Sequence, residues 1–304
     1  MSFLYLLEGI RNPLFDAFFS FITHFGEETL FIIIGLLFFW CIDKEEGFYL
    51  LCVGLIGTVI NQFLKLFFRI PRPWVRDPDF TIVESARAEA TGYSFPSGHT
   101  QTSVGVYGGV IRWTGRGLLS AVCLALCILV PLSRMYLGVH TPADVGVSTV
   151  VALALIFILY PIVRKGQRCA KTMRTLFAVM LALAAANVAF VHLYPFPADV
   201  DADNLAHGVK NAYTMLGCIA GIWAIWEADR KYIHFETKAP LAVQVVKLGL
   251  GFALLLCIKG GLKSPLYALT GGHYVADFIR YFLMVAFAGC IWPLTFPWLT
   301  KKLS

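Results

Sequence analysis

The sequence predicts an all-α membrane protein that crosses the bilayer about nine times. Of its 304 residues, 58% are hydrophobic and only 14% are charged, and the mean hydropathy is +0.70. A water-soluble chain carries about 25% charged residues, whereas a spanning helix needs about 20 mostly apolar positions. Nine such helices would use roughly 180 positions, close to the apolar content observed. This composition excludes a disordered chain, an ordinary soluble globule and a nucleic-acid-binding protein.

Nine apolar runs, separated by polar or proline-containing segments, are the predicted spans. Tryptophans stand at the ends of several runs, as expected for side chains at the membrane interface. The runs cover about 29–42, 47–68, 100–113, 117–132, 143–163, 175–193, 213–226, 240–262 and 281–299.

The segment before the first run has a different pattern. Residues 1–24 are rich in Phe and Leu but are interrupted by charged residues and Pro13, which favours an amphipathic helix at the membrane interface. The segment lacks the basic start and small-residue cleavage site of a signal peptide, so we expect it to remain on the chain. The expected parts are this interfacial segment, a core over 25–165 and further spans over 175–304.

The charges indicate how the chain is oriented. Its net charge is +6, and the run 164–174 alone contains five Lys and Arg residues, whereas 194–212 is acidic. Positively charged loops stay in the cytoplasm, so we expect 164–174 inside and 194–212 outside. With nine spans, the N-terminus would lie outside and the C-terminus in the cytoplasm of a cell (plasma) membrane protein. No anionic partner is needed to explain the charge.

The first polar cluster ends the second predicted span. Pro71 and Pro73 cannot continue a helix, so the span should stop near Ile70. Lys65 then lies about one turn from the membrane exit, with Arg72 just beyond it. Taken alone, these cations are typical of side chains that extend from an apolar helix to the interface.

The second cluster is the sequence Tyr93-Ser94-Phe95-Pro96-Ser97-Gly98-His99, which leads directly into the third run. It is explained equally well as a turn with a helix start or as an anion site. The free N–H groups at a helix N-terminus bind anions, and glycine allows close approach. His99 adds a group that exchanges a proton near neutral pH.

The third cluster surrounds the start of the fifth predicted span. Thr141 is placed to cap that helix and Pro142 to occupy its first position, so Asp144 falls in the first turn. The role of Asp144 has two interpretations. Its side chain forms a capping box with Thr141, or it orients the ring of His140. Arg134 precedes this histidine by six residues.

The three clusters fall at the outer ends of their predicted spans, on one side of the membrane. Together they offer three cations, two histidines and one carboxylate: Lys65, Arg72, Arg134, His99, His140 and Asp144. Such clamps suit phosphoryl transfer, in which negative charge spreads over the phosphoryl oxygens. The sequence has no HExxH motif, Walker loop or paired-carboxylate site, so we expect neither metal nor cofactor.

In order and spacing, the three clusters resemble the motifs of the type 2 phosphatidic acid phosphatase (PAP2) superfamily. The matching patterns are Lys-x6-Arg-Pro from Lys65, Pro-Ser-Gly-His from Pro96, and Ser-Arg-x5-His-x3-Asp from Ser133. The resemblance implies a six-helix catalytic core within 25–165. The C-terminal half carries none of these motifs.

The resemblance also implies a metal-independent phosphatase with separate roles for the two histidines. His140 would attack phosphorus and form a phosphohistidine, with Asp144 orienting its ring. His99 would protonate the leaving oxygen and then activate water. The phosphate oxygens would be held by Lys65, Arg72, Ser97, Gly98 and Arg134.

Some residues outside these motifs also attract interest. The stretch 77–90 is a candidate lid or rim that helps to select the substrate. Arg69 and Arg76 are explained by the membrane interface or by a second phosphate. Lys247 and Lys259 lie in an apolar run, where ionisable residues are functional candidates unless they reach the interface.

The leading hypothesis is a lipid phosphate phosphatase whose site opens at the outer face of a membrane. Candidate substrates are isoprenyl pyrophosphates, phosphatidic acid, phosphatidylglycerol phosphate and sphingoid-base phosphates. A soluble sugar phosphate is the alternative substrate. A transporter or flippase that binds phosphorylated lipids without hydrolysis is the alternative class. A vanadate haloperoxidase has a similar oxyanion pocket but is soluble, unlike this chain.

Overall fold

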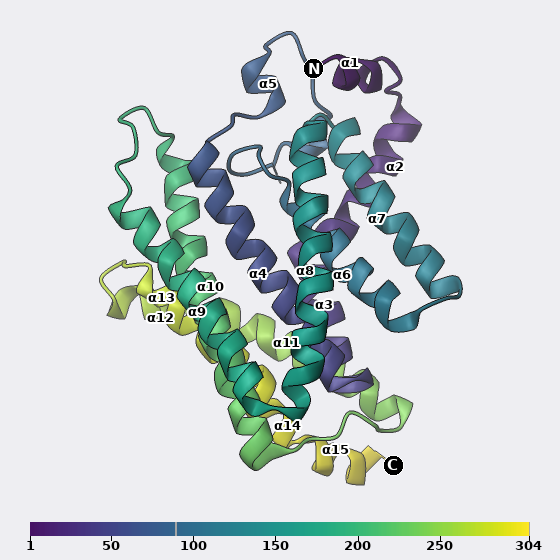
Figure 1. Ribbon diagram of the computed structural model, residues 1–304, viewed down its shortest axis with the longest axis vertical. Coiled ribbons are helices and arrows are strands. Elements are labelled where there is room, and N and C mark those ends of the chain that lie inside the picture. The colour runs from purple at the N-terminus through teal and green to yellow at the C-terminus, as the bar shows by residue number, and fades with distance from the viewer. Residues whose placement is uncertain (89, 304) are drawn as a thin grey trace. The chain divides into compact units, whose positions relative to one another are not determined.

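The computed structural model describes residues 1–88 and 90–303, apart from the side chain of Gln167, and within this part all regular structure is helical (Figure 1). Short 3₁₀ or π-helical turns cover His24–Gly26, Phe38–Ile42, Glu84–Ala86, Asp229–Ile233 and Phe287–Ile291. The α-helices are α1 (Ser2–Gly9), α2 (Pro13–Thr23), α3 (Glu28–Leu37), α4 (Lys44–Phe68), α5 (Pro73–Arg76), α6 (Gly98–Thr114), α7 (Leu118–Tyr136), α8 (Pro142–Arg168), α9 (Ala170–Leu193), α10 (Ala202–Ala228), α11 (Leu241–Gly261), α12 (Lys263–Leu269), α13 (Val275–Ala286), α14 (Trp292–Leu294) and α15 (Phe296–Leu303).

The prediction of a helical membrane protein is confirmed, but the count of nine spans is not. Helices long and apolar enough to cross a membrane number six in the described residues, or seven if one bent pair forms a single span. Helices α6 and α10 are not among these six, because α6 has only 17 residues and α10 begins with polar turns. The spans are Lys44–Arg76, Leu118–Tyr136, Pro142–Gly166, Ala170–Leu193, Leu241–Leu269 and Val275–Leu294, and the bent pair is Pro13–Gly26 with Glu28–Ile42.

The chain forms two compact units, which are described separately. Unit 1 comprises Met1–Ile32, Cys52–Tyr160 and Phe196–Gly208. Unit 2 comprises Ile33–Leu51, Pro161–Pro195 and Val209–Ser304, of which Ser304 lies outside the described residues. All three sequence motifs fall in unit 1, together with the N-terminal segment.

Within unit 1, α6 packs along α7, and α2 packs against α7 (Figure 1). Small residues allow α4 and α8 to approach α6. A Cβ atom added to Gly57 of α4 would lie 2.7 Å from Nε2 of Gln101, and one added to Gly108 of α6 would lie 2.6 Å from Ile156. Both distances are shorter than a real Cβ contact, so a larger residue at either glycine would displace the facing side chain.

Unit 2 contains an aromatic core around α11. The indole N–H of Trp40 donates to the carbonyl of Ala288, and that of Trp292 donates to the carbonyl of Lys247. The Lys247 ammonium is buried and donates to the carbonyls of Glu236 and Thr237. Lys247 therefore supports the packing of unit 2, whereas Lys259 is exposed.

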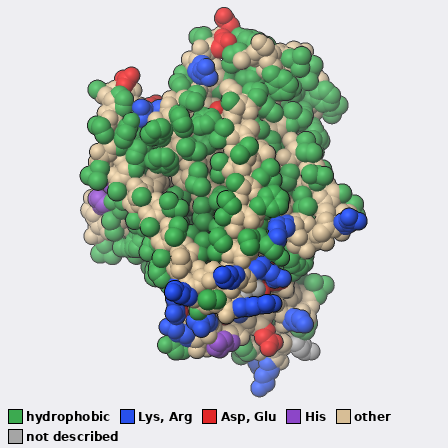
Figure 2. Space-filling model, in the orientation of Figure 1, with side chains coloured by type: hydrophobic (Ala, Val, Ile, Leu, Met, Phe, Trp, Pro, Cys, Tyr) green, Lys and Arg blue, Asp and Glu red, His purple; other side chains and the backbone are tan. Residues whose placement is uncertain are grey.

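Much of the protein surface is apolar, as a lipid-facing protein requires. Figure 2 shows hydrophobic side chains over most of the visible face, and many large ones are exposed, among them Leu118, Phe157 and Leu241. Basic side chains of unit 2, such as Arg164 and Lys231, are about half exposed.

Candidate active site

The first motif lies where α4 ends and the chain turns at two prolines. Helix α4 ends at Phe68, two residues before the predicted end, and Pro73 opens the short helix α5. Lys65 is in the last turn of α4 and Arg72 immediately precedes α5. Both side chains are more than nine-tenths buried. They extend into the protein rather than to the interface.

The second motif forms the start of α6, as predicted. Ser97 is the N-cap, and its hydroxyl oxygen accepts hydrogen bonds from the backbone N–H and the hydroxyl of Thr100. Gly98 is the first helical residue, so its N–H has no partner within the helix ladder. This is the arrangement that favours an anion at a helix N-terminus.

The third motif joins α7 to α8 through a tight turn. Gly138 has φ of +82°, a conformation that other residues rarely adopt, and it reverses the chain after α7. Helix α8 then begins at Pro142, as predicted. The side chain of Asp144 accepts the N–H of Thr141 at 2.7 Å, and the Thr141 hydroxyl accepts the N–H of Asp144 at 3.3 Å. The capping interpretation is therefore correct.

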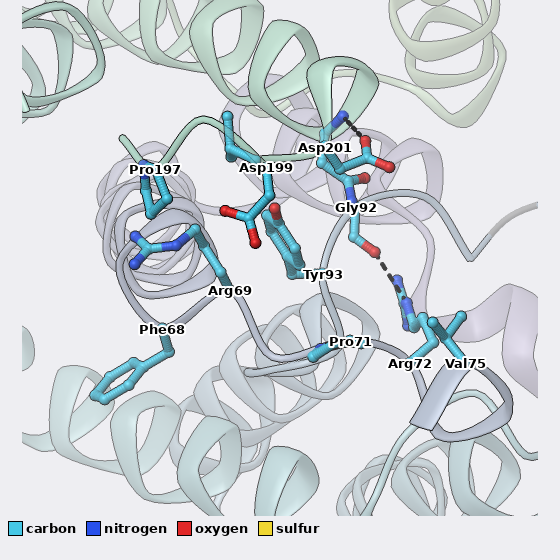
Figure 3. A pocket seen from close by; sticks show the side chains of 12 residues that line it. Phe68, Arg69, Pro71, Arg72, Val75, Gly92, Tyr93, Pro197, Asp199 and Asp201 are labelled. Atoms are coloured by element: carbon cyan, nitrogen blue, oxygen red, sulfur yellow. Dashed lines mark hydrogen bonds between the residues drawn. The ribbon is translucent and has the colours of Figure 1, made fainter. Parts of the chain in front are cut away.

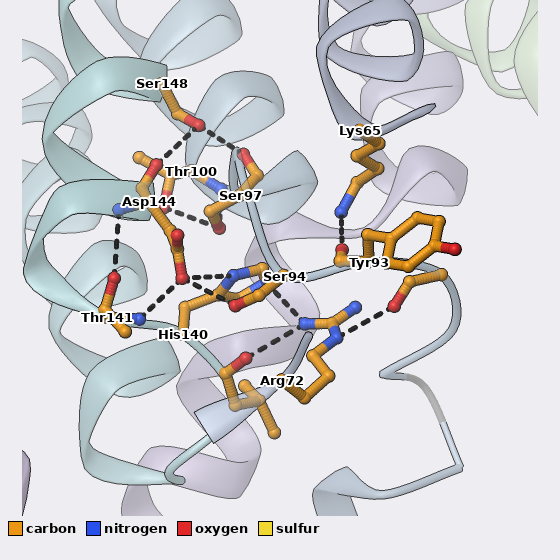
Figure 4. A network of polar contacts seen from close by, with 12 residues as sticks. Lys65, Arg72, Tyr93, Ser94, Ser97, Thr100, His140, Thr141, Asp144 and Ser148 are labelled. Atoms are coloured by element: carbon orange, nitrogen blue, oxygen red, sulfur yellow. Dashed lines mark hydrogen bonds and ion pairs between the residues drawn. The ribbon is translucent and has the colours of Figure 1, made fainter. Parts of the chain in front are cut away.

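Asp144 also faces the ring of His140, so its two interpretations are compatible. Its Oδ2 atom lies 3.5 Å from Nδ1 of His140 (Figure 4). The other ring nitrogen of His140, Nε2, lies 2.9 Å from Nη1 of Arg72. An arginine N–H can only donate a hydrogen bond. Nε2 is therefore the unprotonated nitrogen, and the ring proton is on Nδ1, toward the carboxylate.

The three predicted cations are held by oxygen atoms of the surrounding backbone and side chains. The Lys65 ammonium donates to the carbonyl of Tyr93. Arg134 donates to the hydroxyl of Thr23 at 2.6 Å. Arg72 donates through three nitrogens to the carbonyls of Thr91, Gly92 and Val139, at 2.6, 3.0 and 2.9 Å.

The electrostatic setting keeps the His140 ring neutral. Burial lowers the pKa of His140 well below its usual 6.5, and the three neighbouring cations lower it further. Burial and the positive charges of nearby cations such as Arg134 also lower the pKa of His99, in the first turn of α6. The structure thus brings all of the predicted site residues to one end of α4, α6, α7 and α8. A neutral imidazole among buried cations is suited to attack an anionic group.

Several residues of the site carry no motif signal. The Ser94 hydroxyl donates to Oδ2 of Asp144 at 2.6 Å, and the Ser148 hydroxyl donates to the carbonyl of Ser97 at 2.8 Å (Figure 4). Thr23, the partner of Arg134, belongs to the predicted interfacial segment. Of these, only Ser94 lies in one of the three polar clusters, and nothing in the sequence pairs it with Asp144.

The candidate lid packs against the turn that carries His140. The N–H of Val83 donates to the carbonyl of Leu137, and Arg11 donates to the carbonyl of Thr81 and to that of Tyr136. Glu89, within the stretch 77–90, lies outside the described residues. The described part of this stretch is thus tied both to the N-terminal segment and to the third motif.

A cavity of about 500 Å³ opens beside Arg72 (Figure 3). Arg69, Tyr93 and Gly92 line it on one side, and Asp199 and Asp201 of the acidic segment line the other. Of the predicted site residues, Arg72 borders this cavity. Within the described residues, no three His, Cys, Asp or Glu side chains come together as a metal site would require.

The chain belongs to the PAP2 superfamily. The model of the PAP2 superfamily matches residues 46–168, and that of the PAP2 superfamily phosphatase transmembrane extension matches residues 213–303, together more than half of the chain. The first match contains the three motifs that form the site. The second covers most of the C-terminal part, for which no role follows from the motifs.

Relatives with known names are lipid phosphatases. The chain is 23% identical over 283 residues to a dihydrosphingosine 1-phosphate phosphatase of Schizosaccharomyces pombe, covering 88% of this chain and 66% of the relative. It is 29% identical over 259 residues to a probable sphingosine-1-phosphate phosphatase of Dictyostelium discoideum, covering 80% and 59%. The chain thus spans less than two thirds of each relative. Aquifex aeolicus LpxE, a solved structure, is 27% identical with a TM-score of 0.45, covering 52% of this chain and 92% of that one.

Proposed function

We propose that the protein is a metal-independent phosphatase that removes phosphate from a membrane lipid phosphate through a phosphohistidine intermediate. The observation that carries this proposal is the His140 ring, which is held neutral with Nε2 against Arg72 and Nδ1 toward Asp144. A nucleophile beside cations that can bind the phosphoryl oxygens, with a carboxylate behind its ring, is the arrangement that covalent catalysis requires.

The reaction would proceed in two displacements. Nε2 of His140 attacks phosphorus, the bond from phosphorus to the lipid oxygen breaks, and His99 gives its proton to that oxygen. A water oxygen then bonds to phosphorus while His99 takes the water proton. The P–N bond breaks and inorganic phosphate leaves. Lys65, Arg72 and Arg134 would neutralise the phosphoryl charge throughout.

Among substrates, we propose a sphingoid-base 1-phosphate. The two relatives named for such phosphates align with 88% and 80% of the chain, and so include most of its C-terminal part. A phosphatidylglycerophosphatase B of Bacillus subtilis, 28% identical, aligns with only 49%. The apolar surface supports a substrate whose hydrocarbon chain stays in the bilayer while its phosphate enters the site.

We further propose that the site opens on the outer, non-cytoplasmic face of a cell membrane. The basic segment 164–174 includes the end of α8 that is far from Asp144, and positive segments favour the cytoplasm. Modification of single cysteines introduced at exposed positions, such as Val75 and Leu118, by a membrane-impermeant reagent in intact cells tests this orientation. Labelling at Leu118 but not at Val75 would contradict it.

The test of function is phosphate release by the purified full chain in detergent with EDTA, with the H140N variant alongside. The panel is dihydrosphingosine 1-phosphate, phosphatidic acid, phosphatidylglycerol phosphate, undecaprenyl pyrophosphate and glucose 6-phosphate. We expect release from dihydrosphingosine 1-phosphate that is lost in H140N. Release from glucose 6-phosphate alone would favour the soluble substrate. No release by folded protein would favour the transporter, and strict Mg²⁺ dependence would contradict the mechanism.

A further inference from the structure

Lys65, Arg72 and Arg134 are called the phosphate clamp from here on. Two buried amide side chains next to this clamp have no role in the mechanism above. Asn61 is 3% exposed and Gln101 is 6% exposed. Among the described residues, neither Oδ1 nor Nδ2 of Asn61 has a hydrogen-bond partner, and Nε2 of Gln101 has none. Buried polar atoms are nearly always paired, and leaving them unpaired costs stability. Such a group next to a reaction site therefore points to a ligand.

Both side chains lie in the contact between α4 and α6, directly beside the motifs. Asn61 precedes Lys65 by one helical turn, and its Oδ1 atom lies 3.9 Å from the position that a Cβ of Gly98 would occupy. Gln101 follows Ser97 by one turn. Its Nε2 atom lies against Gly57, one turn before Asn61. Both amides therefore lie along this contact, within one turn of the phosphate-binding residues Lys65 and Ser97.

The unpaired atoms define the chemistry of the ligand. They include an acceptor, Oδ1 of Asn61, as well as N–H donors on both residues. A phosphoryl oxygen only accepts hydrogen bonds, and the clamp already supplies cations for that purpose. Water both donates and accepts, and a buried water typically makes about three hydrogen bonds to such groups. Water fits the set, and hydrolysis of a phosphohistidine requires one.

We propose that Asn61 and Gln101 bind and orient the water that hydrolyses the phosphohistidine. This inference rests on the proposed function. Oδ1 of Asn61 accepts a hydrogen bond from one O–H of the water, and Nε2 of Gln101 donates a hydrogen bond to the water oxygen. The other water proton passes to His99 as the oxygen bonds to phosphorus. The P–Nε2 bond of His140 then breaks, and inorganic phosphate leaves.

The experiment separates the two displacements by rapid quenching. The full chain in detergent reacts with dihydrosphingosine 1-phosphate labelled with ³²P, and phosphoenzyme formation and decay are followed separately. Leucine is close in size to asparagine but forms no hydrogen bonds. In N61L we expect formation at the wild-type rate and decay slower by about tenfold or more. The steady-state level of phosphoenzyme should therefore rise. Q101L should show the same pattern to a smaller extent.

A matched control is available on α9. Asn187 is 4% exposed and its Oδ1 atom also has no hydrogen-bond partner, but it lies in unit 2. N187L should leave both rates unchanged. N61S keeps a small hydrogen-bonding group and should recover most of the decay rate. Thermal melting verifies that each variant is folded, and if N61L is not, Q101L and N61S provide the comparison.

The outcomes separate this inference from the proposed function. Wild-type decay in N61L and Q101L, or equal slowing of formation and decay, would overturn the water site while leaving the phosphohistidine mechanism intact. If the wild type releases phosphate without any phosphoenzyme, the proposed mechanism and the water site fail together. Slower decay in N187L as well would assign the effect to packing and would also overturn the inference.

Discussion

Nε2 of His140 lies 2.9 Å from Nη1 of Arg72, so the nitrogen that we expect to attack phosphorus accepts a hydrogen bond from an arginine of the phosphate clamp. The same guanidinium donates to three backbone carbonyls. The dipoles of these carbonyls stabilise its positive charge. In the proposed mechanism, a phosphate that enters the site replaces the contact between Arg72 and His140. Arg72 would then hold the phosphoryl group in line with the nucleophile.

This arrangement predicts that lysine cannot replace Arg72. Arg72 forms hydrogen bonds through Nε, Nη1 and Nη2 at the same time, whereas lysine has a single side-chain nitrogen. We expect R72K to lower kcat/KM for the lipid phosphate by about 100-fold, as the loss of a positioned donor commonly does. The control is R116K, which changes an exposed arginine in the turn between α6 and α7. Activity of R72K within about threefold of R116K would contradict the clamp.

The second prediction concerns the nucleophile itself. H140N keeps a similar volume and a polar side chain but cannot form a phosphohistidine. We expect phosphate release to fall by at least about 10³-fold while the melting temperature in detergent stays close to that of the wild type. H192N, an exposed histidine of α9, should retain full activity. A folded H140N that forms labelled phosphoenzyme would remove His140 as the nucleophile.

The local features of the site could be predicted from the sequence because they follow from single residues and their neighbours. Pro71 and Pro73 end α4, and the pair Thr141-Pro142 begins α8. These are backbone effects, which act within one turn of the chain. The motif residues came together because they occur at the ends of four helices that share one end of unit 1.

What the sequence did not predict depends on contacts across the fold. Thr23 reaches Arg134 across 111 positions, and Ser94 reaches Asp144 across 50. No local pattern specifies such pairs. The count of about nine spans is not confirmed, because an apolar run predicts a helix but not its length, and α6 has only 17 residues. A helix that is buried inside a membrane protein can have the same apolar composition as a short membrane-spanning helix, so composition alone does not separate the two.

The third prediction concerns the contact between Ser94 and Asp144. The Ser94 hydroxyl donates to the same oxygen that faces His140, so it fixes the orientation of the carboxylate. We expect S94A to lower kcat by about tenfold with little change in KM, because partners of a catalytic group act through its orientation. S103A removes another buried hydroxyl, which bonds only within α6, and should leave kcat unchanged. Equal values for the two variants would mean that Asp144 needs no support from Ser94.

The last prediction is a dependence of stability on pH. The folded protein holds the pKa of His140 well below 6.5, the value expected in the unfolded chain. Between these two values the unfolded state binds more protons, so stability increases with pH. The contribution of His140 is therefore full above about pH 6.5 and declines as the pH falls toward its folded pKa. The wild type should lose melting temperature below about pH 6.5, and H140N should lose less.

Melting curves of the two proteins in the same detergent, recorded from pH 8 to pH 4.5 in the absence of phosphate, measure this difference. Asparagine does not titrate, so the difference between the curves isolates the proton uptake of His140 from that of the other acidic and basic groups. H192N, which replaces an exposed histidine of α9, provides the matched control curve. Parallel curves for the wild type and H140N would mean that burial and the neighbouring cations do not lower the pKa of His140 in the folded protein. A ring that remained readily protonated would then be unsuited to attack phosphorus near neutral pH, because only the neutral imidazole has a free electron pair on Nε2.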